Sequence, residues 1–405
     1  MMRLTRFGVE LLSAAFFLAA SATSPARAEG LKLGALMPMT GGLQAYGASS
    51  FNGVKLAIDE INRAGGVNGD KVSLAVGDTQ TAPQAGVDAA KKLVSIEGVH
   101  GLIGALSSGV TIPVASTVSA KDGIVQISSA STSPEITGLK DNDFLFRTVP
   151  TDAVQGIALA QLAKGKKLKS ISIFYVNNDY GKGLADSFAG AFSKAGGKVV
   201  QSVGFEEKQA SYRGELQKTA RGKAQALLLI SYPEDGIPIL KQSLQGGFFS
   251  KFVFTDGMKA PEIIKSIGAK YLNGSFATAP QAVGRASVIF QQAYEAKFGQ
   301  LPPKPFIDSA YDATILMALA AQKAGSNKSK AMRDALRSIA NPPGVKVLPG
   351  QFAKAKKLLA EGKDIDYVGA SGPQNFDANG DVAGTYAHWE IKDGKIVTIR
   401  VFEPK

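Results

Sequence analysis

The chain has 405 residues, a formal net charge of +12, no cysteine and only two histidines. Disulfides and Cys/His metal clusters are therefore excluded, while the length is sufficient for two domains. The lysines are scattered and not gathered with aromatic residues into one patch, so the sequence predicts a solvated basic surface and no nucleic-acid partner.

The first 28 residues have the pattern of an export signal. Arg3 and Arg6 precede an apolar run over residues 11–20, and Ala26-Arg27-Ala28 follows. This order predicts a signal peptide over residues 1–28 with cleavage after Ala28. The apolar run is well short of the ~18 residues that a transmembrane helix needs. We therefore expect an exported protein located in the periplasm.

Strand and helix patterns alternate through the first part of the chain. Short apolar runs predict strands, and apolar residues spaced three and four apart predict helices. Such alternation is typical of parallel βαβ units. The predicted strands cover residues 31–37, 71–76, 99–103 and 124–127, and the predicted helices lie near residues 48–64, around 87–94 and from 108 onward.

A second alternating series follows Pro150. After residue 280 helices dominate, and two strands joined by an Asp-Gly turn close the sequence. The two series predict an α/β protein with two lobes, each a mostly parallel sheet flanked by helices. The predicted elements of this part are helices 152–163, 182–195, 310–324, 328–339 and 351–361, and strands 170–176, 198–203, 226–230, 251–254, 275–278, 385–391 and 395–402.

Known catalytic motifs are missing from the sequence. It contains no G-x-S-x-G, no P-loop, no G-x-G-x-x-G and no H-E-x-x-H. The segment Asp377-Ala-Asn379-Gly380-Asp381 departs from the calcium-loop pattern and predicts a polar turn. We therefore expect no enzyme activity, no metal and no cofactor.

Polar residues follow several predicted strands. In the first lobe they are Ser107-Ser108-Gly109 and the segment 128–135; in the second lobe they are the segments 178–181, 231–234 and 255–257. Ligands of open α/β sheets bind beyond the carboxyl ends of the strands. Helix capping, turn formation and ordinary packing explain each segment equally well when it is taken singly. Two lobes that face each other with these edges would form a cleft.

The order and spacing of several segments resemble the periplasmic branched-chain amino-acid-binding family, the leucine/isoleucine/valine-type receptors of ABC transporters. These segments cover residues 34–47, 52–66, 102–113, 127–137, 146–148, 179–183, 311–313 and 372–381. The resemblance implies a two-lobed type I periplasmic binding protein with a three-stranded hinge. It predicts a signal peptide over 1–28, an N-terminal lobe of residues 29–147 and 277–361, and a C-terminal lobe of residues 148–276 and 362–405.

The resemblance also implies a ligand site between the lobes. The first lobe would hold the α-carboxylate and ammonium of the ligand, an aromatic pocket would hold its side chain, and the second lobe would close over it. Asp256 would face the ammonium; it is one methylene shorter than the glutamate common in the family, which leaves the ligand identity open. The implied contact residues are Tyr46, Ser108, Ala130, Thr132, Tyr180, Tyr232, Asp256 and Phe306.

These expectations describe a monomeric solute-binding protein without enzyme activity. It would capture a small amino-acid-like ligand by hinge closure and deliver it to the permease subunits of an ABC importer. A sensor of the same fold, passing its signal to another protein, is the alternative. The sequence does not separate the two functions, because the surface that contacts the partner lies outside the cleft.

Overall fold

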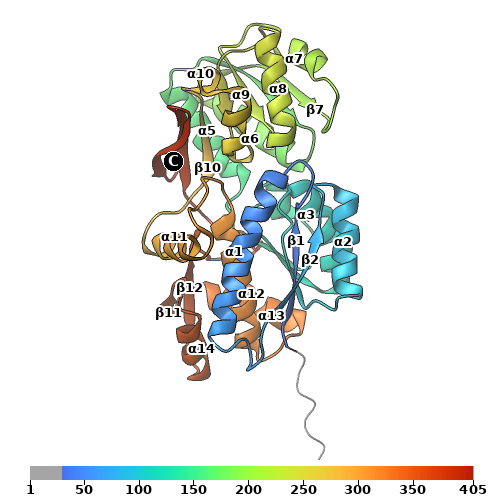
Figure 1. Ribbon diagram of the computed structural model, residues 1–405, viewed down its shortest axis with the longest axis vertical. Helices are drawn as coiled ribbons and strands as arrows, with labels where there is room; N and C mark the ends of the chain where they lie inside the picture. Colours follow the sequence, from blue (N-terminus) through green and yellow to red (C-terminus); the bar gives the residue numbers. More distant parts are fainter. Residues whose placement is uncertain (1–29, 405) are drawn as a thin grey trace, which may run out of the picture.

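The computed structural model describes residues 30–404, which form two α/β lobes stacked along the long axis of the molecule (Figure 1). The predicted signal peptide lies outside these residues. Across residues 30–404, no helix combines the length and the apolar character that crossing a membrane requires.

The first lobe is built on a five-stranded parallel sheet with the order β2-β1-β3-β4-β5. Alternate residues of β1 face opposite sides of this sheet: Leu33 and Ala35 pack in one core with α1, and Leu36 packs in a second core with α2 and α3. Helix α12 lies alongside α1 (Figure 1). The elements of this lobe are β1 (Lys32–Met37), α1 (Gln44–Arg63), β2 (Ser73–Asp78), α2 (Pro83–Ser95), β3 (Gly101–Ile103), α3 (Ser108–Val114), the π-helix η1 (Ala115–Ser119), α4 (Ala120–Asp122), β4 (Val125–Ser128), the 3-10 helix η2 (Pro134–Gly138), β5 (Leu145–Arg147), α11 (Arg285–Phe298), α12 (Ile307–Ala324) and α13 (Ser329–Ala340).

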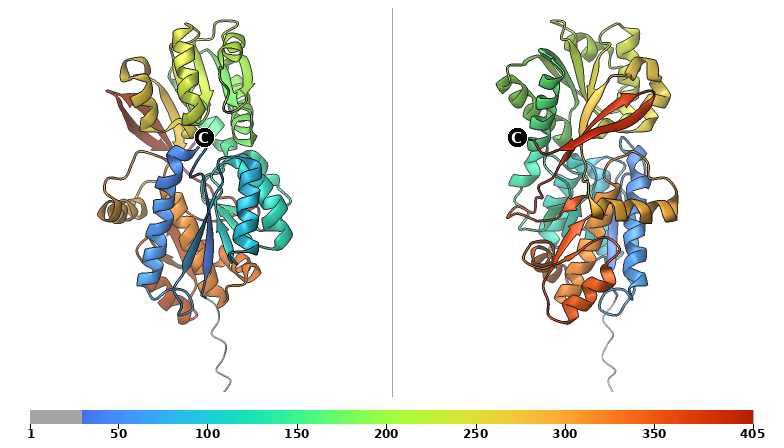
Figure 2. Two further views of the ribbon diagram at one scale, coloured as in Figure 1. Left: turned by 45° about the vertical axis from the view of Figure 1, so that its right-hand side comes forward. Right: turned by 90° about the vertical axis from the view of Figure 1, so that its left-hand side faces the viewer.

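The second lobe is built on a seven-stranded sheet with the order β15-β14-β10-β9-β8-β6-β7. Its central strands are parallel, and the C-terminal hairpin β14–β15 adds two antiparallel strands at one edge. This hairpin is the long red ribbon in the right view of Figure 2. The elements are α5 (Asp152–Gly165), β6 (Ser170–Val176), α6 (Asp179–Lys194), β7 (Lys198–Phe205), α7 (Arg213–Thr219), β8 (Ala226–Ile230), α8 (Pro233–Gln245), β9 (Phe252–Phe254), the 3-10 helix η3 (Asp256–Met258), α9 (Pro261–Ile267), α10 (Ala269–Leu272), β10 (Phe276–Pro280), β14 (Tyr386–Lys392) and β15 (Lys395–Phe402).

A small third sheet extends the first lobe. It contains β11 (Val345–Val347), β12 (Ile365–Gly369) and β13 (Gly372–Pro373), and helix α14 (Phe352–Ala360) connects its first two strands. The predicted helix over 351–361 is confirmed as α14, whereas these three strands were not predicted. Strand β12 packs against α12 and α13, so the whole extension belongs to the first lobe.

The chain changes lobe three times, and two of the changes occur later than the boundaries expected from the sequence. The first lies between β5 and α5, in agreement with residue 148. Strand β10 pairs with β14 over its full length and with β9 at Phe276 and Ala277, so the second change follows Pro280 and does not lie at residue 277. Strands β12 and β13 stay with the first lobe, so the third change lies between β13 and β14 and not at residue 362.

Helices α1, α6 and α12 begin earlier than their sequence patterns indicated. Helix α1 begins at Gln44 and not near residue 48. Helix α6 begins at Asp179, because the Asn178 side chain accepts a hydrogen bond from the backbone N–H of Gly181 at 3.0 Å and so caps the helix. The polar residues that followed β6 in the sequence therefore form the first turn of a helix that faces the other lobe.

Candidate functional site

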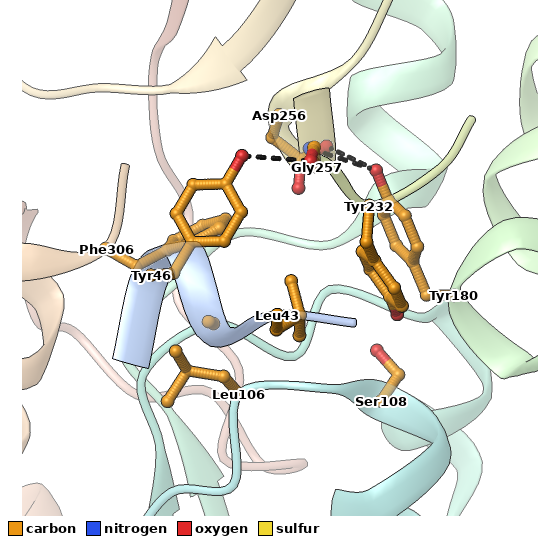
Figure 3. A pocket seen from close by; sticks show the side chains of 10 residues that line it. Leu43, Tyr46, Leu106, Ser108, Tyr180, Tyr232, Asp256, Gly257 and Phe306 are labelled. Carbon is orange, nitrogen blue, oxygen red and sulfur yellow. Dashed lines mark hydrogen bonds between the residues drawn. The ribbon is translucent and has the colours of Figure 1, made fainter. Parts of the chain in front are cut away.

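A cavity lies between the two lobes (Figure 3). The start of α1 and the loops after β3 and β4 bound it from the first lobe, and the first turn of α6 and the segments after β8 and β9 bound it from the second. The lining residues are Leu43, Tyr46, Leu106, Ser108, Ala130, Tyr180, Tyr232, Asp256, Gly257 and Phe306.

Seven of the eight residues expected from the sequence line this one cavity. Thr132 is the exception: it is fully buried, and its hydroxyl donates to Asp152 Oδ2 at 2.8 Å. Thr132 therefore lies behind the cavity wall, where it supports a carboxylate. Sequence reasoning did not identify Leu43, Leu106 and Gly257, because apolar and glycine residues in loops carry no pattern that marks them as binding residues.

The apolar part of the cavity is formed by first-lobe residues. Leu43, Leu106 and the rings of Tyr46 and Phe306 surround this part (Figure 3). Phe306 has a left-handed backbone with φ of 73° and precedes α12 directly. Non-glycine residues hold this conformation at a cost of ~1–3 kcal/mol, and such strain is concentrated at functional sites. In this position Phe306 lines the cavity together with Tyr46.

Two tyrosines of the second lobe form the opposite wall. The rings of Tyr180 and Tyr232 are stacked, with centroids 5.5 Å apart and planes inclined by 14°. The Tyr180 hydroxyl lies 2.8 Å from Thr255 Oγ1 and donates to Asp256 Oδ1 at 3.1 Å. These hydrogen bonds fix the edge of the wall next to Asp256.

Two buried carboxylates give the site its electrostatic character. Asp256 Oδ1 accepts from Gln155 Nε2 at 2.6 Å, and burial raises the pKa of Asp256 to about 6. Burial and the nearby Asp256 charge raise the pKa of Asp152 well above its usual range. Asp152 Oδ1 has no hydrogen-bond partner among residues 30–404. A cation at the Asp256 side of the cavity would stabilise both charges.

Hydrogen-bond donors occupy the first-lobe side of the cavity. Ser108 Oγ accepts from the backbone N–H of Ser133 at 3.2 Å, which leaves its own O–H free to donate to an anion. Ala130, in the loop after β4, also lines the cavity. The site thus combines a hydroxyl donor from one lobe with an acidic group from the other.

Direct contacts hold the lobes together around the cavity. Tyr46 of the first lobe donates its O–H to the carbonyl oxygen of Gly257 of the second lobe at 2.9 Å (Figure 3). The hydroxyls of Ser107 and Tyr232 lie 3.3 Å apart across the same boundary. The two lobes are therefore in direct contact beside the cavity.

Neither histidine lies in the cavity. His100 Nδ1 accepts from the backbone N–H of Lys32 at 3.0 Å, and His388 lies beside Glu390 in the C-terminal hairpin. In the part of the chain that the structure describes, no group of three His, Asp or Glu side chains is placed to hold a metal ion.

Comparison with known proteins identifies the family. The model of the periplasmic binding protein family matches residues 30–379. The leucine-, isoleucine-, valine-, threonine- and alanine-binding protein of Pseudomonas aeruginosa is 30% identical over 331 residues, covering 81% of this chain and 87% of that protein. A chemotactic signal transduction system substrate-binding protein of Halobacterium salinarum, BasB, is 25% identical over 375 residues, covering 90% and 88%.

A solved structure agrees with both the fold and the family. The crystal structure of the leucine-binding protein LivK of Thermotoga maritima superposes with a TM-score of 0.79 at 25% identity, covering 92% of this chain and 99% of that one. The predicted two-lobed type I fold is thereby confirmed. The chain belongs to the periplasmic binding protein family, among relatives that include the branched-chain amino-acid-binding proteins.

Proposed function

We propose that this protein captures an aliphatic zwitterionic amino acid in the cavity between its lobes and delivers it to an ABC importer in the cell envelope. The main support for this ligand class is that one cavity between the lobes has both an acidic end and an apolar end. Asp256 would bind the ammonium, Ser108 and the backbone at Ala130 the carboxylate, and the first-lobe apolar residues the side chain. The chain would work as a periplasmic monomer.

The buried acids favour a ligand with an amine over a simple carboxylic acid. Burial raises the pKa of both Asp256 and Asp152, and the Asp256 charge raises that of Asp152 further, so both are destabilised as anions without a ligand. A ligand ammonium would offset this repulsion, whereas a ligand with a carboxylate alone would add a third negative charge. The name of the Pseudomonas aeruginosa relative supports the same ligand class.

The apolar end favours an aliphatic side chain of moderate size. Leu43, Leu106, Tyr46 and Phe306 present carbon surface there, and no charged side chain shares this part of the lining. Burying a leucine-sized side chain contributes ~1.5–3 kcal/mol. A lysine or glutamate side chain would place an unpaired charge against these residues.

A sensor role is the second candidate, because one relative is a substrate-binding protein of a chemotactic system. Deleting the gene and measuring uptake of radiolabelled leucine separates the two roles. Loss of uptake supports import. Retained uptake with loss of taxis toward the ligand supports the sensor.

Thermal unfolding of the refolded, ligand-free protein tests the proposed ligand class. We expect leucine, isoleucine and valine to stabilise it, by about 2.7 kcal/mol at a concentration of 100 times Kd. The deaminated analogue 4-methylpentanoate should have at most a small effect. Stabilisation by 4-methylpentanoate equal to that by leucine would contradict the ammonium role of Asp256.

A further inference from the structure

A second cavity lies on the hinge side of the molecule, apart from the one lined by Tyr46 and Asp256. It is a groove bounded by the second lobe change, by the loop 301–305 and by α11, which projects where the two lobes meet (Figure 1). Ile307 of the first lobe and Ile396 of the second both line it. A molecule in this groove would therefore touch both lobes.

The groove contains a buried lysine without a close counter-ion. Lys259 is 6% exposed, and its Nζ donates to Gln281 Oε1 at a long 3.3 Å. Among residues 30–404, no carboxylate oxygen lies within the 4.0 Å of Lys259 Nζ that an ion pair requires. Burial lowers the pKa of Lys259 to about 8, so the side chain still carries its proton at neutral pH. Lysines this deeply buried are almost always paired, so a partner for this one is expected.

An acidic side chain of the other lobe lines the same groove. Asp308 lies in the first turn of α12, and its Oδ1 accepts from the backbone N–H of Ser309 at 2.9 Å. Lys259 is close enough to interact with Asp308 electrostatically, yet the two do not form a direct ion pair. Lys259 of the second lobe and Asp308 of the first thus line one groove without forming a direct ion pair.

We propose that this groove is a second ligand site, which takes a small zwitterion whose carboxylate binds Lys259 and whose ammonium binds Asp308. Val288, Phe290 and Leu301 provide apolar surface for an aliphatic side chain in the same groove. A simple carboxylic acid would leave Asp308 without a partner, and a simple amine would leave Lys259 without one.

Occupation of the groove would be coupled to closure of the lobes. Lys259 belongs to the second lobe and Asp308 to the first, so a bridging ligand binds best in one arrangement of the lobes. Asp256 of the interlobe cavity starts the short helix η3, and Lys259 directly follows it. A ligand in one cavity would therefore change the affinity of the other, and the effect would be reciprocal.

Calorimetric titration of the full, ligand-free protein with leucine tests the second site. We expect a weaker binding event in addition to any event in the interlobe cavity. Lys259→Met should weaken this event at least tenfold, and Asp256→Asn should leave it in place. Neither 4-methylpentanoate nor 3-methylbutylamine should reproduce it within tenfold, because each lacks one of the two charges.

A second variant, which blocks the groove sterically, distinguishes loss of the site from a folding defect in Lys259→Met. Val288 lines the groove and is 51% exposed, so Val288→Trp should obstruct the groove without disturbing the core. Ile96→Trp, at a residue 75% exposed and outside the groove, is the matched control and should bind as the unmodified protein does.

The possible outcomes separate this inference from the proposed function. A leucine event sensitive to Lys259→Met and Val288→Trp supports the second site, even if the event that depends on Asp256 is absent and the proposed function fails. Identical titrations of the unmodified protein and both groove variants, or a single event removed by Asp256→Asn, would overturn the second site.

Discussion

Asp256 carries the acidic character of the interlobe cavity, so its ionisation predicts how ligand affinity depends on pH. Burial raises its pKa to about 6, and only the carboxylate form binds an ammonium well. We expect the affinity for leucine to fall as the pH is lowered through about 6, measured by calorimetry at about pH 5 and about pH 7. Asp256→Asn should bind weakly at both values.

The same carboxyl group affects the stability of the ligand-free protein with a defined sign. Its pKa is about 3.9 when unfolded and about 6 when folded, so between these values the folded state binds more protons. Stability of the ligand-free protein should therefore fall as the pH rises from about 4 to 6, and this loss should be smaller in Asp256→Asn. Asp88→Asn, which changes an exposed helix residue, is the control and should keep the full pH dependence. An Asp256→Asn profile identical to that of the unmodified protein would contradict this assignment.

Thr132 has a supporting role that can be measured. Its hydroxyl donates to the buried Asp152, so Thr132→Val should leave that carboxylate with one hydrogen bond fewer and lower the free energy of unfolding by about 1–3 kcal/mol. Thr132→Ser keeps the hydroxyl and should lose much less. Urea unfolding measures both variants, and equal losses would show that the lost methyl packing, and not the hydrogen bond, is responsible.

At the level of single residues, the sequence predicted the residues that line the cavity better than the buried residues that support them. Tyr46, Tyr180, Tyr232 and Asp256 follow strands or begin helices, the family resemblance implied all four as ligand contacts, and they do line one cavity. The partner of Thr132 lies twenty residues away at the start of another helix, and no local pattern links the two. The sequence did not reveal that Lys259 lies near Asp308 or that Arg147 forms an ion pair with Asp381, because the members of each couple come from distant segments.

The end of β5 is fixed by a buried charge pair that spans the chain. Arg147 is fully buried; its Nε and Nη2 donate to the two carboxylate oxygens of Asp381 at 2.6 and 2.8 Å, and Nη1 donates to the Ser133 carbonyl at 2.8 Å. This contact joins the start of the first lobe change to the segment that makes the third. The segment 377–381, which the sequence marked only as a polar turn, thus supplies the counter-ion.

Removing the acidic partner of Arg147 should strongly destabilise the fold. Asp381→Ala leaves a buried guanidinium without its counter-ion, and we expect a loss of about 3–5 kcal/mol in the free energy of unfolding. Asp186→Asn is the control, because Asp186 pairs with Lys182 on the exposed surface of α6, where a change of less than about 1 kcal/mol is expected. Similar losses in the two variants on chemical denaturation would contradict the role of the buried pair.

At the level of elements, the alternation of strands and helices was predictable, and the second and third lobe boundaries were not. The apolar runs that became β1, β6 and β8 carry the pattern of buried parallel strands. Strand β10 pairs with a strand that lies more than one hundred residues later, so its extent depends on a contact that local sequence does not encode. The short strands β11 and β12 were missed for the same reason, since each forms by pairing with the other across α14.

At the scale of the whole molecule, the contacts that close the lobes should determine affinity. The Tyr46 O–H to Gly257 carbonyl hydrogen bond exists only when the lobes are together. Tyr46→Phe keeps the ring but removes this bond, and a loss of about 0.5–1.5 kcal/mol corresponds to roughly 2- to 12-fold weaker ligand binding. Small-angle X-ray scattering should show a larger radius of gyration for the ligand-free variant. Unchanged affinity and unchanged scattering would show that this bond does not contribute to closure.

A crystal structure of the protein grown with leucine tests the central claim most directly. The account predicts leucine in the interlobe cavity, with its ammonium within hydrogen-bond distance of Asp256, its carboxylate at Ser108 and Ala130, and its side chain between Tyr46 and Phe306. An interlobe cavity empty at saturating leucine, or a ligand held there with its carboxylate toward Asp256, would contradict it.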